Sequence, residues 1–173
     1  MINTEKIKFI IEQGEGISIE FKKASEELPR SVFETICSFL NRKGGYILLG
    51  VKDNGRIEGI REDSVQKQLK TLANDQNNPK IISPPVRLET EVIEIDGKKI
   101  ICIQVPESAQ VHTYNGTYYD RNQDGDYKLT NFFRTGRLYF GSSGIVWKTQ
   151  CTGNGLSELQ NGCSVPERRY RQI

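Results

Sequence analysis

Three carboxylates stand beside segments with strand patterns, and together they could bind a metal ion. Glu15 precedes and Glu20 lies within an alternating segment, and Asp53 follows an apolar run that ends at Val51. Carboxylate oxygens are the ligands that Mg²⁺ and Mn²⁺ prefer. A metal ion held by these groups could activate water and stabilise the charge on a phosphate. The alternative is that they are ordinary surface acids, because exposed Glu and Asp side chains are common on proteins.

The three acids can meet only if two predicted strands run side by side. Residues 15–22 alternate apolar and polar side chains, which is typical of a half-buried strand and places Lys22 on the same face as Glu20. Residues 46–51 form an apolar run between glycines and a turn sequence, which predicts a buried central strand. We expect the two strands to pair and to gather the acids at one rim of the sheet.

Basic and aromatic side chains near the same segments could hold a nucleic acid. Lysine and arginine bind backbone phosphates, and aromatic rings stack on bases. Aromatic residues in a strand also serve simply for packing, and this alternative stays open. The candidates for nucleic-acid binding are Lys22, Lys23, Arg42, Lys43, Tyr118 and Arg121.

The remaining patterns predict an α+β fold, in which a mixed, mostly antiparallel sheet has helices packed on one face. The expected helices cover residues 4–13, 29–42 and 62–77. The expected later strands cover residues 86–95 and 98–105, and residues 111–121 are expected to form a short hairpin. Asn54-Gly55, Asp96-Gly97 and Asn115-Gly116 predict tight turns, and at Asn54-Gly55 we expect a type I′ turn with positive φ at both residues.

Composition and charge divide the 173 residues into two parts. Residues 1–130 carry the periodic patterns and form one predicted domain. Residues 131–173 hold six Lys or Arg against two acids and lack a sustained period, so we expect an irregular basic extension that is partly ordered at best. No apolar run approaches the roughly 18 residues of a membrane span, and the N-terminus lacks a signal-peptide pattern, so we expect a cytoplasmic protein.

Metal sites built from cysteine or histidine are not expected. The four cysteines are widely scattered and His112 is the only histidine, so neither a zinc site nor a disulfide framework is predicted. Gly44-Gly45 is not followed by the Gly-Lys-Ser/Thr of a phosphate loop, so the sequence contains no such nucleotide-binding motif.

Four motifs in order resemble the Schlafen/AlbA-like domain over about residues 5–130. They are Glu15-Gly-Ile-Ser-Ile-Glu-Phe-Lys, the run from Cys37 to Gly59, Ile101-Cys-Ile-Gln-Val-Pro and Tyr118-Tyr-Asp-Arg. The resemblance implies a Schlafen core fold and a DNA-binding domain of a bacterial transcriptional regulator. Older descriptions of such proteins name ATP binding. Animal relatives are metal-dependent endoribonucleases with two glutamates and an aspartate, which fall on Glu15, Glu20 and Asp53.

The leading hypothesis is therefore a module that binds DNA or RNA in a transcriptional regulator. The first alternative is an endoribonuclease that uses Mg²⁺ or Mn²⁺ at the three carboxylates, and the second is a nucleotide (ATP)-binding protein. Whether the chain is an enzyme is left open. The nucleolytic animal members pair two lobes, and a homodimer could supply the second lobe for this chain.

Overall fold

The computed structural model describes residues 4–129 and the backbone of two short strands beyond them. The helices are α1 (Thr4–Gln13), α2 (Ser31–Leu40) and α3 (Glu62–Gln76). The strands are β1 (Ile19–Lys22), β2 (Gly45–Leu49), β3 (Ile82–Ser83), β4 (Glu89–Ile95), β5 (Lys98–Val105), β6 (Thr113–Tyr114), β7 (Thr117–Asn122), β8 (Gly125–Leu129), β9 (Tyr139–Gly141) and β10 (Gly144–Val146). Apart from the antiparallel pair β9 and β10, the prediction for residues 131–173 lies outside the described residues.

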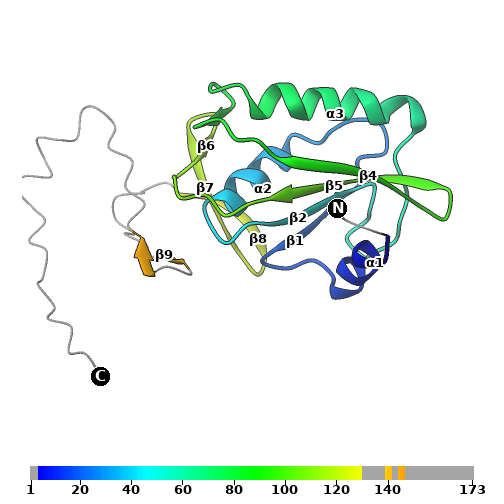
Figure 1. Ribbon diagram of the computed structural model, residues 1–173, viewed down its shortest axis with the longest axis horizontal. Helices are drawn as coiled ribbons and strands as arrows, with labels where there is room; N and C mark the ends of the chain where they lie inside the picture. The colour runs from blue at the N-terminus through cyan, green and yellow to red at the C-terminus, as the bar shows by residue number, and fades with distance from the viewer. Residues whose placement is uncertain (1–3, 130–138, 142–143, 147–173) are drawn as a thin grey trace, which may run out of the picture.

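The first sheet contains the strand pair on which the candidate site depends. Its order is β1-β2-β5-β4, and only the β1-β2 pair is parallel. Ile19 lies opposite Tyr46 and Lys22 lies opposite Leu49, so the predicted pairing of these two segments is confirmed. The α+β class and the mixed, mostly antiparallel sheet are also confirmed, as Figure 1 shows.

Helices cover both faces of this sheet, so the expectation of helices on one face is wrong. Ile47 and Ile101 pack in a cluster with residues of α2 and α3. Leu48 and Cys102 point to the opposite face, where they pack with Ile7 of α1. Successive side chains of a strand alternate between faces, and both faces of β2 and β5 are apolar. A second helical layer is therefore needed to keep water from the face that α2 and α3 do not cover.

A second, smaller sheet packs on the other side of α2, where a single sheet was expected. Its order is β3-β6-β7-β8 and all its pairs are antiparallel. The apolar side of α2 faces the first sheet, and its polar side chains bond to β7 and β8. This arrangement places α2 between the two sheets, and brings β7 within reach of β1.

The three predicted tight turns differ in their backbone. Asp96-Gly97 has φ values of 50° and 71°, and Asn115-Gly116 has 48° and 73°, as a type I′ turn requires. At Asn54-Gly55 only Gly55 has positive φ, and its N–H donates to the Lys52 carbonyl at 2.8 Å. The chain folds back there through one bridge, Val51 to Ile57, so the expected type I′ turn at this position is wrong.

No helix within the described part of the chain combines the length and the apolar character needed to cross a bilayer.

Candidate functional site

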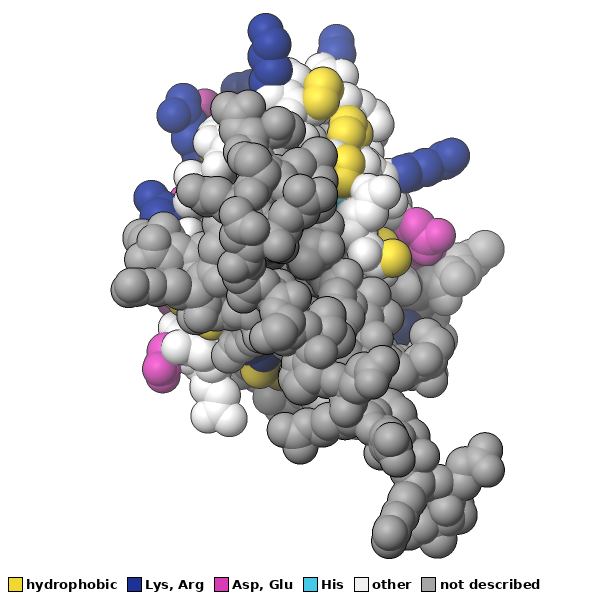
Figure 2. Space-filling view, turned by 90° about the vertical axis from the view of Figure 1, so that its left-hand side faces the viewer, with side chains coloured by type: hydrophobic (Ala, Val, Ile, Leu, Met, Phe, Trp, Pro, Cys, Tyr) yellow, Lys and Arg dark blue, Asp and Glu magenta, His cyan; other side chains and the backbone are white. Residues whose placement is uncertain are grey.

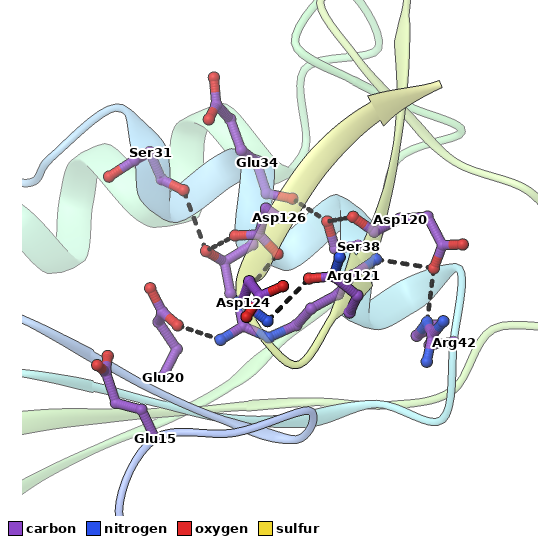
Figure 3. Close-up of polar contacts among 12 residues, drawn as sticks. Glu15, Glu20, Ser31, Glu34, Ser38, Arg42, Asp120, Arg121, Asp124 and Asp126 are labelled. Atoms are coloured by element: carbon purple, nitrogen blue, oxygen red, sulfur yellow. Dashed lines mark hydrogen bonds and ion pairs between the residues drawn. The ribbon is translucent and has the colours of Figure 1, made fainter. Parts of the chain in front are cut away.

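A buried ion-pair network joins β1 to the second sheet. Nη2 of Arg121, on β7, donates to Oε2 of Glu20, on β1. The same guanidinium donates through Nη1 to Asp126 at 3.0 Å and through Nε to the Gly16 carbonyl at 3.0 Å. Arg121 is 3% exposed and Glu20 is 8% exposed. Figure 3 shows Arg121 reaching between the two carboxylates.

The charges of this network support one another. Burial alone would lower the pKa of Arg121, but the negative charges of Glu20 and Asp126 outweigh it and raise that pKa. The guanidinium therefore stays charged. It also lies 5.3 Å from the centre of the Phe39 ring, at a distance that allows a cation–π contact.

A second pair lies beside the first. Nε of Arg42, just after α2, donates to Oδ1 of Asp120 at 2.6 Å. Asp120 also accepts from the Tyr127 hydroxyl at 2.9 Å and from the backbone N–H of Arg121 at 2.8 Å. Burial would raise the pKa of Asp120, but these hydrogen bonds, with the one from Arg42 largest, hold it below its ordinary value. Arg42 is thereby fixed by a carboxylate that is itself fully buried.

Small polar residues of α2 and of the position just after it complete the network, and they were not predicted from the sequence. Thr35 Oγ1 donates to Asp126 at 2.5 Å, and Ser38 Oγ donates to the Asp120 carbonyl at 3.3 Å. Asn41 donates to the Tyr119 carbonyl at 3.0 Å. The signal in the sequence is their spacing of three, which forms a polar stripe on an otherwise apolar helix. Asp120 and Asp126 were missed as well, although Asp120 lies within the Tyr118-Tyr-Asp-Arg motif.

Glu15 lies beside the outer edge of β1. Its Oε1 accepts a hydrogen bond from the Phe21 backbone N–H at 2.9 Å, which satisfies a donor on the unpaired side of the strand. Burial raises the pKa of Glu15, and the charges of Glu20 and Asp53 raise it further, against the lowering by the Phe21 N–H. Glu15 thus lies near enough to Glu20 and to Asp53 for each of their charges to act on it.

Asp53 occupies an exposed turn after β2, and no hydrogen bond or ion pair of its side chain is seen within residues 4–129. Over the same residues, no three His, Cys, Asp or Glu side chains are grouped so that they could hold a metal ion. The Mg²⁺ or Mn²⁺ site at Glu15, Glu20 and Asp53 stays a prediction.

The predicted nucleic-acid-binding residues have two kinds of environment. Lys22 bonds to Glu20, and Arg121 is buried, so neither offers its charge freely to solvent. Lys23 is 62% exposed at its side chain and lies 3.9 Å from Glu58. Tyr118 is partly exposed.

The exposed bases lie at both ends of the β1-β2 pair. Lys23 follows the last residue of β1, whereas Arg42 and Lys43 precede the first residue of β2. Because the two strands are parallel, these positions are at opposite ends. Lys43 is exposed, and no hydrogen bond or ion pair of its side chain is found in the described residues. Figure 2 shows Lys and Arg side chains projecting at several points along the margin of one face.

The glycine pair at the start of β2, Gly44 and Gly45, serves close packing. A Cβ on Gly44 would lie 2.4 Å from the Val105 carbonyl, and one on Gly45 would lie 2.7 Å from the Phe39 ring. Both distances are too short for a side chain, so each position requires glycine for packing. Nucleotide binding stays an untested alternative.

The described cysteines are buried thiols, and the histidine lies buried at the end of the segment that connects β5 to β6. Burial raises the pKa of Cys37 and of Cys102 to about 12, so both remain protonated at neutral pH. The two nitrogens of His112 lie 2.8 Å from the Pro84 carbonyl and 2.7 Å from the Ser108 hydroxyl. Its ring is thus held by its neighbours within the domain.

Matches to known proteins cover the part of the chain that contains the ion-pair network. The model of the family described as Schlafen, AlbA_2 matches residues 15–130. The N-terminal domain of a protein described as related to the ATP-dependent DNA helicase RecG, from Nitrosomonas europaea, is 27% identical and has a TM-score of 0.49. That match covers 62% of this chain and 74% of the other.

A second solved structure, the DIP2311 protein from Corynebacterium diphtheriae, is 16% identical and has a TM-score of 0.49. The match covers 71% of this chain, which spans 29% of the DIP2311 chain. The family match extends over more than half of the 173 residues and contains the three acids and both ion pairs described above. The chain therefore belongs to the Schlafen, AlbA_2 family.

Proposed function

We propose that this chain is a nucleic-acid-binding module whose exposed bases contact the phosphate backbone, as would suit the DNA-contacting part of a transcriptional regulator. Membership of the Schlafen, AlbA_2 family supports the class of partner. The observation that carries the proposal is the pair Arg42-Lys43, which lies just before β2.

Arg42 is oriented before any ligand arrives. Its Nε is engaged by Asp120, and its side chain is 22% exposed. Apart from that bond, no hydrogen bond or ion pair of the Arg42 side chain is found among residues 4–129, so the outer Nη groups have donors left for a phosphate. An arginine fixed in this way loses less side-chain entropy on binding than a mobile one. Lys43 adds a second positive charge beside it.

Lys23 supplies a further phosphate contact at the other end of β1. It is more exposed than Arg42, and its nearest acid, Glu58, lies at 3.9 Å, which is a weak restraint. Because the two groups of bases are separated by the length of the strands, a bound nucleic acid would run along the β1 edge. Lys22 and Arg121 have no direct role in this proposal, because Glu20 and Asp126 already hold them.

Fluorescence anisotropy with labelled DNA and RNA oligonucleotides, single- and double-stranded, tests the proposal. Three phosphate contacts predict that affinity falls between roughly 50 and about 200 mM salt, by about 40-fold for duplex DNA and about 20-fold for single strands. Replacing Lys43 with alanine should weaken binding to every sequence and reduce the salt slope by about one. The matched control is Lys70→Ala, which removes an exposed lysine from α3, away from this edge. Undetectable binding to both DNA and RNA, or binding that does not depend on salt, would contradict the proposal.

A further inference from the structure

The two oxygens of Glu20 are both occupied by cationic side chains. Oε2 accepts from Arg121 and Oε1 accepts from Lys22. The side chain of Arg121 is 3% exposed, so water cannot replace Glu20 as its partner. Glu20 therefore has a structural role, which is to neutralise the buried guanidinium of Arg121.

Arg121 in turn connects three segments. Its nitrogens reach Glu20 on β1, Asp126 on β8 and the Gly16 carbonyl in the loop that carries Glu15. The planar guanidinium suits this role because it presents donors in fixed directions. The position of the first sheet relative to the second thus depends on the Glu20–Arg121 pair.

The residues of this rim do not fit the divalent metal site that the family resemblance implies. A carboxylate binds a metal ion through lone pairs of its oxygens, and here each oxygen of Glu20 already accepts a hydrogen bond from a cation. A divalent ion placed at Glu20 would lie next to the charges of Lys22 and Arg121 and would be repelled by both. If Glu20 turned away from them, a buried guanidinium would lose one of its two carboxylate partners.

We infer that Glu20 is the buried counter-ion of Arg121, a positioning residue that joins the two sheets, and that this chain takes no divalent metal ion at Glu20. Glu15 has a related structural role at the same rim, since it accepts from the Phe21 backbone N–H. The inference does not depend on nucleic-acid binding, so each can fail without the other.

The absence of a divalent metal site at Glu20 is tested by a Mn²⁺ titration of the full chain at neutral pH. The electron paramagnetic resonance signal of free Mn²⁺ monitors the binding. The titration is run on the wild type, Glu20→Gln and Asp53→Asn. The expected result is the same weak, unsaturable binding in all three. One saturable site in the wild type that disappears in both variants would overturn the inference. Asp53 is exposed and its side chain has no hydrogen bond or ion pair within the described residues, so Asp53→Asn should fold normally and keeps the test decisive.

Thermal unfolding of a double-mutant cycle tests whether Glu20 is the counter-ion of Arg121. Glu20→Gln and Arg121→Met should each lower the unfolding midpoint by about 10 °C, because each deprives a buried charge of an oppositely charged partner that water cannot replace. The unfolding midpoint of the double variant should fall by clearly less than the sum of the two single decreases, because neither the Glu20 charge nor the Arg121 charge remains. Additive losses would overturn the inference. If Arg121→Met does not fold, Arg121→Gln takes its place in the cycle.

Discussion

Two groups of arginine ion pairs in this protein differ in burial, and the difference separates structural from surface charge. Arg121 is 3% exposed at its side chain and holds Glu20 and Asp126, which are 10% and 11% exposed. At the start of α3, Arg61 holds Glu26 at 3.2 Å and Asp63 at 2.8 Å, but all three side chains are at least 60% exposed. Each arginine has two carboxylate partners, so the number of contacts does not distinguish the groups.

Solvent decides what these contacts contribute. Around Arg61, water can replace either carboxylate at almost no cost, since exposed pairs are weak. Around Arg121, the loss of a contact leaves a charge that water cannot reach, and this lowers the stability of the fold. The first group therefore adds charge to the surface, whereas the second fixes how the two sheets and α2 are assembled.

The largest effect should come from replacing Arg121 with lysine. The charge is kept, but one ammonium group cannot reach Glu20, Asp126 and the Gly16 carbonyl from one position. Losing a hydrogen bond to a charged group costs about 1.5–3 kcal/mol, so we expect the free energy of unfolding to fall by about that amount. Urea unfolding at neutral pH measures it.

The matched control for that experiment is Arg61→Lys, the same chemical change in the exposed group. Its urea midpoint should equal that of the wild type. If both variants lost the same stability, burial would not be the property that distinguishes the two groups.

A smaller, pH-dependent effect is expected at Asp120. Its pKa is held below the ordinary value of 3.8, so its carboxylate adds stability that is complete above that value. This stability is lost as the pH falls through the lowered pKa of the folded state. Because asparagine keeps an acceptor oxygen but not the charge, Asp120→Asn should cost about 1–1.5 kcal/mol at neutral pH, and progressively less as the pH falls below 3.8.

Urea unfolding of the wild type and Asp120→Asn across the acid range gives this difference directly. A difference that stayed constant from neutral pH to well below 3.8 would show that the ionised form of Asp120 is not what stabilises the fold.

Local patterns predicted most of the elements of the fold. The segment with helical spacing at residues 4–13 and the run at residues 98–105 have the bounds that the sequence suggested. Asp96-Gly97 and Asn115-Gly116 adopt the expected turns because both residues of each pair tolerate positive φ. The Asn54-Gly55 turn differs, since the Gly50 carbonyl accepts from the N–H groups of both Glu58 and Gly59 and the strands do not continue past it.

The arrangement of the two sheets and the ion-pair network were harder to predict from the sequence. Binary patterning identifies which side chains are apolar, but it does not reveal that β7 and β8 belong to a separate sheet on the far side of α2. Arg121 was predicted as an exposed phosphate contact because nothing in its local sequence indicates burial. Its environment depends on Glu20, which lies 101 positions away in the chain. Contacts over such separations are fixed by tertiary packing.

The smallest effect is expected for the pair of Lys99 and Glu62. Nζ of Lys99 lies 2.6 Å from the Glu62 carboxylate, as close as Arg42 lies to Asp120, but the Glu62 side chain is 77% exposed. Salt screens exposed charges, and side-chain entropy opposes the fixed geometry. Lys99→Met should therefore shift the urea midpoint slightly at low ionic strength and not measurably at high ionic strength, whereas the loss in Arg121→Lys should persist in both. A salt-resistant loss in Lys99→Met as large as that in Asp120→Asn would mean that distance, and not burial, sets the strength of these pairs.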